Sequence, residues 1–243
     1  MWQVLREELH PKGLEIVTVG LDSVGAEACR PFIEAAQPVH PSLVDPHHLV
    51  AELFGVIQVP NGVWIDEDGV IVRPAETSPA PPVDRVPMAG GDVELPQRLT
   101  EIFGEASHIE TQPEDYHAAL RDWVEKGAAS EFALSPEEVI ARSRPRTADI
   151  ALGQAHFELA TELEKRGSHE AAVRYFREAH RLFPHSWTYR RQAWSLEREG
   201  DGPLARFWQG PLSDDPESWP YEGDWLRDIR EAGAANYYEP WVP

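Results

Sequence analysis

Two short features of the sequence could take part in chemistry: a lone cysteine and a valine–proline pair. Cys29 is the only cysteine among the 243 residues. An intramolecular disulfide or a cysteine-based zinc site would need at least one more. The neighbouring Arg30 would favour a thiolate, so Cys29 is a candidate nucleophile. A lone cysteine beside Ala28 and near Phe32 is, however, more typical of a small apolar residue that packs in a core, and we expect that role.

Other polar clusters do not match a known kind of site. His40, His47 and His48 lie close in sequence, but adjacent residues point in different directions and no zinc-enzyme spacing accompanies them. The acidic run 66–68 is typical of a solvated turn. The sequence contains neither a glycine-rich phosphate loop nor a Gly-x-Ser-x-Gly motif. We therefore expect no metal and no cofactor.

The second feature is Val59-Pro60, which stands directly before the apolar run "NGVWID". An X-Pro bond costs only about 0.5–1 kcal/mol to hold in the cis form. A cis bond would turn the backbone groups of Val59 outward, where an extended peptide could pair with them. The alternative is a trans proline at the start of an edge strand. Taken alone, the Val-Pro pair favours the trans form; together with the flanking pattern, we expect the cis form.

The elements that must position this pair begin with a β-rich apolar run over 13–23. It ends in Asp-Ser, a favourable pair for a helix N-cap. A helix is then predicted over 24–37, kinked or restarted at Pro31, because an interior proline loses a backbone hydrogen bond.

Residues 42–73 continue the alternation of strands and helices. A short strand, a turn at Asp45-Pro46 and a helix that ends at Gly55 are predicted first. "NGVWID" and "GVIVRP" then form two strands, and the Asp-Gly pair between them supplies a hairpin turn.

This order of elements resembles the thioredoxin fold, specifically the thiol–disulfide oxidoreductases of the TlpA and ResA type in the AhpC/TSA superfamily. The resemblance rests on "KGLEIVTVGLD" and "LVDPHHLVAELFGVIQVPNGVWIDEDGVIV", within residues 1–73. In that family a Gly-Val-x-x-Val-Pro segment with a cis proline precedes the hairpin, and residues 55–60 match it. The resemblance implies that Val59 and Pro60 bind substrate. The Asn-Gly that follows departs from the small hydroxyl residues usual there.

The resemblance starts after the family's central strand and its Cys-x-x-Cys motif. "MWQVLREELHPKG" matches the remainder of the redox helix, with Trp2, Leu5 and Leu9 on one face. Two hypotheses follow: the protein is a relative that has lost its redox site, or the natural product starts upstream of Met1 and carries a thiol or selenocysteine motif there. In both, the thioredoxin-like half is incomplete. We expect the chain to aggregate or to depend on another segment that completes its sheet.

The remainder of the chain is predicted to be mainly helical. Residues 74–112 form an insertion or linker, since 74–92 are rich in Pro and Gly and carry neither the helical nor the strand period. A helical region follows over 113–200. Its first helix, 113–127, either supports the later helices or closes the thioredoxin-like domain.

Residues 153–186 resemble a tetratricopeptide repeat, a pair of antiparallel helices. The matching residues are Ala160, Ala172, Phe176, Ala179 and Pro184, with Leu159 at the leucine position and His156 and Leu163 in place of the usual Trp and Tyr. Small residues at these positions allow two helices to approach closely, and Gly167-Ser168 supplies the turn. A further helix over 186–200 would pack through Ala193 and Trp194.

The C-terminal tail, 201–243, is rich in aromatic residues: Trp208, Trp219, Tyr221, Trp225, Tyr237, Tyr238 and Trp241. We expect it to fold back and cover the apolar face of the helices. The alternative is a partner-binding element, since Trp and Tyr dominate interface energies.

Composition restricts the class of function. The net charge of −20 argues against nucleic-acid binding. No apolar run approaches the roughly 20 residues that span a bilayer, and the first residues are not a signal peptide, so a cytoplasmic protein is predicted. The resemblance implies a thioredoxin-like oxidoreductase with a thiol or disulfide substrate, its redox motif being absent from this chain. The alternative is a redox-inactive scaffold that binds a protein partner, in part through its helical half.

Overall fold

The computed structural model describes residues 2–79, 95–197, 205–212 and 214–243. The chain forms two compact units that interleave along the sequence. The first unit contains Met1–Val83, Thr111–Arg146 and Pro240–Pro243, and the second contains Asp84–Glu110 and Thr147–Glu239.

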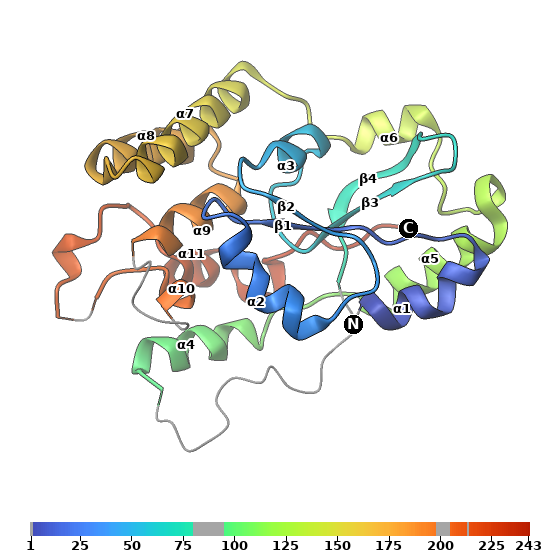
Figure 1. Ribbon diagram of the computed structural model, residues 1–243, viewed down its shortest axis with the longest axis horizontal. Coiled ribbons are helices and arrows are strands. Elements are labelled where there is room, and N and C mark those ends of the chain that lie inside the picture. Colours follow the sequence, from blue (N-terminus) through green and yellow to red (C-terminus); the bar gives the residue numbers. More distant parts are fainter. Residues whose placement is uncertain (1, 80–94, 198–204, 213) are drawn as a thin grey trace. The chain divides into compact units, whose positions relative to one another are not determined.

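The first unit contains both sheets and the helices around them (Figure 1). Its elements are α1 (Trp2–Leu9), η1 (His10–Lys12), β1 (Thr18–Leu21), α2 (Ala26–Ala36), β2 (Ser42–Asp45), α3 (Leu49–Phe54), β3 (Asn61–Ile65), β4 (Ile71–Thr77), α5 (Pro113–Lys126), η2 (Gly127–Ala129) and α6 (Pro136–Arg142). The predicted α/β order of the N-terminal half is confirmed.

The four strands form two separate two-stranded sheets among the described residues. β1 and β2 pair in parallel, with α2 as the crossover between them, and β3 and β4 form an antiparallel hairpin. The turn of the hairpin uses Gly69 at φ +80°, a left-handed conformation that favours glycine. The Asp66 carboxylate accepts hydrogen bonds from the backbone of Asp68 and Val70, as expected for the predicted acidic turn.

Strand β4 extends to Thr77 and therefore runs into the segment that was predicted to be linker. The register between the strands shifts twice, and both shifts place the additional residue on β4. Pro74 falls at the first of these bulges, where a proline does not interrupt the ladder. The predicted strand "GVIVRP" ends at Pro74, whereas the observed strand continues to Thr77, so the prediction that only loop or linker follows Pro74 was wrong.

Helix α2 also differs from its prediction at its start. Its N-cap is Gly25 rather than the Asp-Ser pair, and no side chain caps it. The Asp22 carboxylate accepts a hydrogen bond from Val24 N instead. Pro31 lies inside the helix, which continues through it from Ala26 to Ala36.

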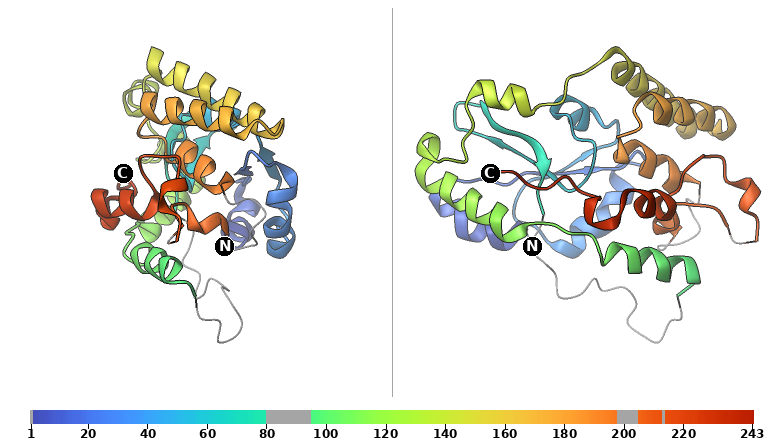
Figure 2. Two further views of the ribbon diagram at one scale, coloured as in Figure 1. Left: turned by 90° about the vertical axis from the view of Figure 1, so that its left-hand side faces the viewer. Right: turned by 180° about the vertical axis from the view of Figure 1, so that it is seen from behind.

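The core of the first unit lies between α1, α5 and the hairpin. Leu5 and Leu9 of α1 pack with Leu120 of α5 in this cluster, and α1 and α5 lie side by side (Figures 1 and 2). Trp64 of β3 stacks on Trp123 with ring centroids 5.1 Å apart. Of the two roles considered for residues 113–127, the structure supports the one that closes the α/β unit.

The last residues of the chain complete this core. Trp241 is buried and donates a hydrogen bond from Nε1 to Glu76 Oε1 at 2.9 Å. Its backbone N–H donates to Gln112 Oε1. The guanidinium of Arg73, fully buried, lies over the rings of both Trp64 and Trp241. The end of the aromatic tail is therefore part of the first unit and not of the helical one.

The second unit is helical throughout its described part. Its elements are α4 (Gln97–Ala106), α7 (Ala148–Lys165), α8 (His169–Leu182), α9 (Trp187–Leu196), α10 (Ala205–Trp208), η3 (Pro216–Ser218), α11 (Trp225–Ala232) and η4 (Ala234–Asn236). α4 lies inside the range 74–112, so that range is not a linker throughout. Residues 80–94, where the Pro/Gly-rich prediction is concentrated, lie outside the described residues.

Helices α7 and α8 form the predicted hairpin (Figure 1). Ala160, Ala172, Phe176 and Ala179 are all buried, as predicted, and Gly167 has a left-handed φ of +72° in the turn. Leu159 is exposed, and Phe157 is buried in its place. Ala193 and Trp194 of α9 pack in the same core, as predicted.

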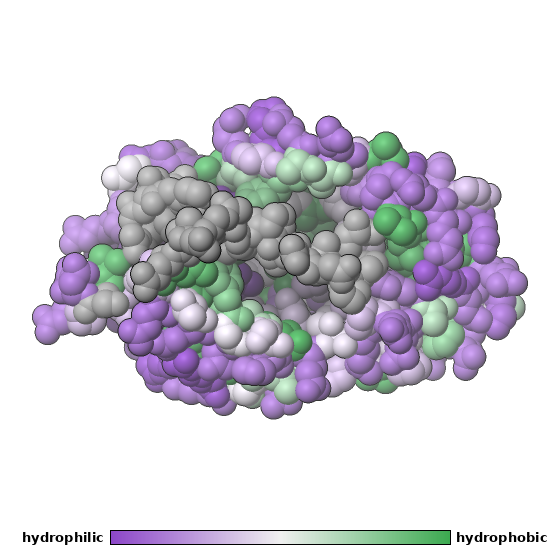
Figure 3. Space-filling view, turned by 90° about the horizontal axis from the view of Figure 1, so that it is seen from below, coloured by the Kyte–Doolittle hydropathy of each residue, from purple (hydrophilic) through white to green (hydrophobic). Residues whose placement is uncertain are grey.

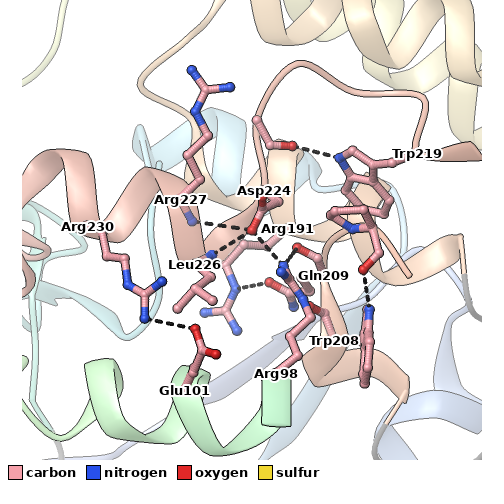
Figure 4. A network of polar contacts seen from close by, with 12 residues as sticks. Arg98, Glu101, Arg191, Trp208, Gln209, Trp219, Asp224, Leu226, Arg227 and Arg230 are labelled. Atoms are coloured by element: carbon pink, nitrogen blue, oxygen red, sulfur yellow. Dashed lines mark hydrogen bonds and ion pairs between the residues drawn. The ribbon is translucent and has the colours of Figure 1, made fainter. Parts of the chain in front are cut away.

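The aromatic tail up to Tyr238 packs on these helices. Tyr221, Trp225 and Tyr237 are buried in the core cluster, and Trp208, Trp219 and Tyr238 pack against it. A polar network holds the tail in place (Figure 4), with Arg98 bonded to Asp224 at 2.6 Å and Arg230 to Glu101 at 3.1 Å. The prediction that the tail covers the apolar helical face is confirmed for this part.

The exterior agrees with the acidic, polar composition. Hydrophilic residues predominate on the face drawn in Figure 3, and hydrophobic residues form scattered patches there. No helix in the described part of the chain is long and apolar enough to cross a bilayer.

Candidate functional site

The Val59-Pro60 peptide bond is cis, as predicted. Val59 is 41 % exposed and precedes the first residue of β3 by two positions. Pro60 O accepts hydrogen bonds from Ser78 N at 3.2 Å and from Asn61 Nδ2 at 3.2 Å. The pair therefore lies where the hairpin begins, with one exposed apolar side chain.

Strand β3 has one paired edge and one open edge. Pro60 O accepts from Ser78, and Asp66 N donates to Val70 O, so the even-numbered residues from 60 to 66 direct their backbone groups toward β4. Successive residues of a strand alternate in this direction. The N–H and C=O of Val63 and Ile65 consequently point to the edge that no described strand covers.

Strand β1 has an open edge of the same kind. Thr18 N donates to Pro41 O, next to β2, at 3.0 Å. The alternation then turns the backbone groups of Val19 and Leu21 away from β2. In the first unit, two strands thus each present an edge that could accept a further strand. These four residues were not identified from the sequence, although their runs of β-branched and apolar residues marked them as strand.

The layer built on β1 and β2 is poorly buried compared with the hairpin. None of the residues of α2 or β1 is buried, although α2 is amphipathic. Phe32 of α2 is 57 % exposed and Leu43 of β2 is 53 % exposed. Two apolar side chains of this layer, Phe32 and Leu43, are thus largely open to solvent.

Cys29 lies in α2 with its side chain against β1. A Cβ built on Gly20 would approach Cys29 Sγ to 3.0 Å, so the thiol fills the space that Gly20 leaves. The residue is half-buried and forms no disulfide. This is the packing role expected for Cys29, and nothing in the geometry joins it to Val59-Pro60.

The histidines of this region do not converge on one another. His40 and His48 are buried, and His40 Nδ1 is 3.2 Å from Pro41 O. The Asp45 carboxylate accepts from Leu49 N and Val50 N and so stabilises the start of α3. No group of three or more His, Cys, Asp or Glu residues that could hold a metal ion occurs in the described ranges.

The residues behind β3 are buried and joined by a hydrogen bond. Trp64 Nε1 donates to Tyr116 Oη at 2.8 Å. Burial raises the pKa of Tyr116 to about 12, so the hydroxyl stays protonated at neutral pH. Gly62 is required in this strand because an added Cβ would lie 2.6 Å from Tyr116 Oη and 2.8 Å from Ser78 Cβ. The hairpin thus presents its open edge from a fixed position.

Comparisons with known proteins identify no relative. No protein-family model, no curated protein and no solved structure matches this chain.

Proposed function

We propose that the first unit is a cytoplasmic, thioredoxin-like module that binds an extended segment of polypeptide along the open edge of β3, from Val59 and Pro60 onward. The observation that carries the proposal is that, among the described strands, β3 pairs only with β4 and directs the N–H and C=O of Val63 and Ile65 to its other side. An added strand would satisfy these groups, which is the usual basis of recognition by strand addition.

The side chains of the region fit such a ligand. Val59, two residues before β3, is 41 % exposed, and Ile65, the last residue of β3, is 44 % exposed. An incoming segment that is apolar at alternate positions would cover them while its backbone pairs with β3. Extended polypeptide of this kind is exposed in unfolded or partly folded proteins.

A thioredoxin-like module could also carry out thiol chemistry. The resemblance implies that a substrate held at Val59-Pro60 would meet a redox thiol at the N-terminal end of α1. Cys29 packs against Gly20 of β1, so we propose that it takes no part in exchange. A redox pair would then come from residues outside this sequence; without one, the module is a redox-inactive scaffold.

Strand addition is tested by removing one outward-facing donor. Val63→Pro deletes the N–H at the open edge, where proline is tolerated because no ladder bond uses that group. Val63→Thr keeps the N–H and serves as the matched control. The probe is a permanently unfolded chain, such as reduced and carboxymethylated lysozyme, labelled for fluorescence anisotropy. We expect binding to the wild type and the Thr variant, and at least tenfold weaker binding to the Pro variant.

Equal binding by both variants, or no binding by the wild type, would rule out recognition at this edge. Circular dichroism of each variant establishes that the hairpin is retained. Intact-mass analysis of the protein from its natural source separates the two redox forms: a product with an additional N-terminal thiol or selenol pair indicates the oxidoreductase, and a mass of Met1–Pro243 indicates the scaffold.

A further inference from the structure

The second unit contains a pocket of about 390 Å³ that the proposed function does not use. Its wall is formed by α8, α9, α11 and the segment that leads into α11, and it includes His180, Arg190, Trp194, Tyr221 and Asp228. A volume of this size suits a small organic molecule.

Two N–H donors of Trp and Arg side chains in the wall have no hydrogen-bond partner among the described residues. They are Trp194 Nε1 and Arg190 Nε. Trp194 is only 1 % exposed, so water does not readily compensate for the missing bond. A buried polar group without a partner costs about 1–3 kcal/mol, and such a group in a native fold usually has a specific reason.

The other tryptophans of this unit show how unusual Trp194 is. In the network of Figure 4, Trp208 Nε1 donates to Pro211 O at 2.9 Å and Trp219 Nε1 donates to Gly223 O at 2.9 Å. Both indoles are less buried than Trp194, which lacks such a carbonyl. Within the described part of this unit, these two indoles have carbonyl acceptors, whereas Trp194 in the pocket has none.

The charges around the pocket favour an anion. Four arginines line it: Arg177, Arg181, Arg190 and Arg227. Of the three acidic residues in the lining, Glu178 is paired with Arg181 at 2.9 Å and Asp228 with Arg190 at 2.6 Å. Glu222 is the third, and its carbonyl accepts a hydrogen bond from Arg227. Four arginines against three carboxylates leave the lining one positive charge in excess, within a chain of net charge −20. Arg227 also pairs with Glu231, outside the lining, at 2.8 Å.

The aromatic groups of the wall add an apolar surface and no positive charge. The rings of Tyr221 and Trp194 pack around the ring of His180, with centroid separations of 5.3 Å and 6.3 Å. Burial, together with the nearby Arg190, lowers the pKa of His180 to about 3. The imidazole is therefore neutral at physiological pH. Its Nε2 atom also has no hydrogen-bond partner among the described residues.

We propose that this pocket binds a small organic oxyanion, a carboxylate or a phosphate monoester, with its oxygens toward Trp194 Nε1–H and Arg190 Nε–H and its apolar part against the aromatic wall. Oxyanions accept several hydrogen bonds at once, which satisfies both donors. Arg190 is held for this role, because Asp228 fixes one end of its guanidinium and the ring of Trp187 lies 4.2 Å from its Cζ.

The test follows the nine tryptophan indole N–H signals of the ¹⁵N-labelled full chain during titration. The probes are benzoate, phenyl phosphate, inorganic phosphate and, as a neutral match to benzoate, benzamide. Trp194→Phe assigns the pocket signal. We expect benzoate or phenyl phosphate to shift it saturably, the signals of Trp208 and Trp219 to stay in place, and benzamide to have no effect. Saturation by benzoate alone indicates a carboxylate, and saturation by the phosphates alone indicates a phosphate.

Variants then test the two donors by calorimetry. Arg190→Lys keeps the charge beside Asp228 but removes Nε–H, and Trp194→Phe keeps an aromatic ring but removes Nε1–H. Each should weaken binding at least fivefold. Trp208→Phe, at a tryptophan outside the pocket lining, is the matched control and should bind as the wild type does. Unchanged affinity in both donor variants, equal binding of benzamide, or no saturable shift, which would indicate an ordered water only, would overturn the proposal.

Discussion

Arg73 and Glu76 form a bidentate ion pair inside the first unit, with Nε 2.7 Å from Oε1 and Nη2 3.0 Å from Oε2. The guanidinium also donates to Phe132 O and Val242 O. It thereby joins β4, the loop before α6 and the end of the chain. One residue of the hairpin thus holds together segments that are far apart in sequence.

Replacing Arg73 with Met should therefore destabilise the first unit. Breaking a buried pair by removing one partner costs about 3–5 kcal/mol, because the remaining charge is left without compensation. Urea unfolding followed by circular dichroism measures the change. Arg227→Met is the control, since its pair with Glu231 is exposed on both sides and such pairs contribute at most about 1 kcal/mol. Equal losses in the two variants would contradict a special role for Arg73.

Tyr116 should make the first unit less stable at high pH. Its pKa of about 12 in the folded protein, raised chiefly by burial, lies above the value of about 10 in an unfolded chain. The folded state therefore binds more protons between these values, and the free energy of unfolding falls as pH rises through them. Tyr116→Phe should lose this part of the pH dependence. It should also cost about 1–3 kcal/mol at pH 7, because Trp64 Nε1 loses its acceptor.

His180 should make the second unit less stable at low pH. Its folded pKa of about 3 lies below the unfolded value near 6.5, so the unfolded state binds more protons in between. The free energy of unfolding should fall by about 1.4 kcal/mol per pH unit as pH drops below about 6. Urea titrations at pH 7.5 and pH 5 compare the wild type with His180→Gln, which should lack this component.

His169 provides a control of opposite sign. Although burial acts to lower its pKa, Glu164 and Glu197 together raise it. The contribution of His169 to the free energy of unfolding is therefore fully present below its pKa in the unfolded chain. It is lost as pH rises through its pKa in the folded protein. His169→Gln should reduce stability at pH 5 more than at pH 7.5. The same direction of change in both variants would contradict these assignments.

The contact between Gly20 and Cys29 predicts a compensating pair of substitutions. Gly20→Ala would place a Cβ 3.0 Å from Cys29 Sγ, and such overpacking costs about 1–3 kcal/mol. Cys29→Ala removes the sulfur, so the double variant should recover most of the loss. A double-mutant cycle in urea measures the coupling. Additive effects would show that the thiol does not limit the space at Gly20.

Much of the local structure was determined by the sequence itself. The Asp-Gly pair and the alternating apolar residues on either side specify the hairpin, because side-chain period and turn geometry are properties of neighbouring residues. The alanines of α7 and α8 specify a close helical pair in the same way, and Val59-Pro60 was predicted to be cis from its flanking pattern. The repeat pattern assigned the leucine position to Leu159, but Phe157, on another face of the same helix, is the residue that is buried.

The tertiary structure decided which of these elements share a core. Trp241 packs with Arg73 and Glu76 of the hairpin, whereas the rest of the aromatic tail packs on the helices. Nothing local distinguishes Trp241 from Trp225, since both are aromatic residues in a polar segment. Glu76, which accepts the hydrogen bond from Trp241, is 165 residues away in sequence. Pairing across that distance depends on the packing of the whole unit.

The open edges and the pocket were likewise decided by packing. Whether Val63 has a neighbouring strand depends on what lies beside β3 in space, and the sequence of β3 is the same in both cases. Trp194 was predicted to pack, and it does. That its N–H has no acceptor among the described residues is a property of the space between α8, α9 and α11, because hydrogen-bond partners depend on distances in three dimensions and not along the chain.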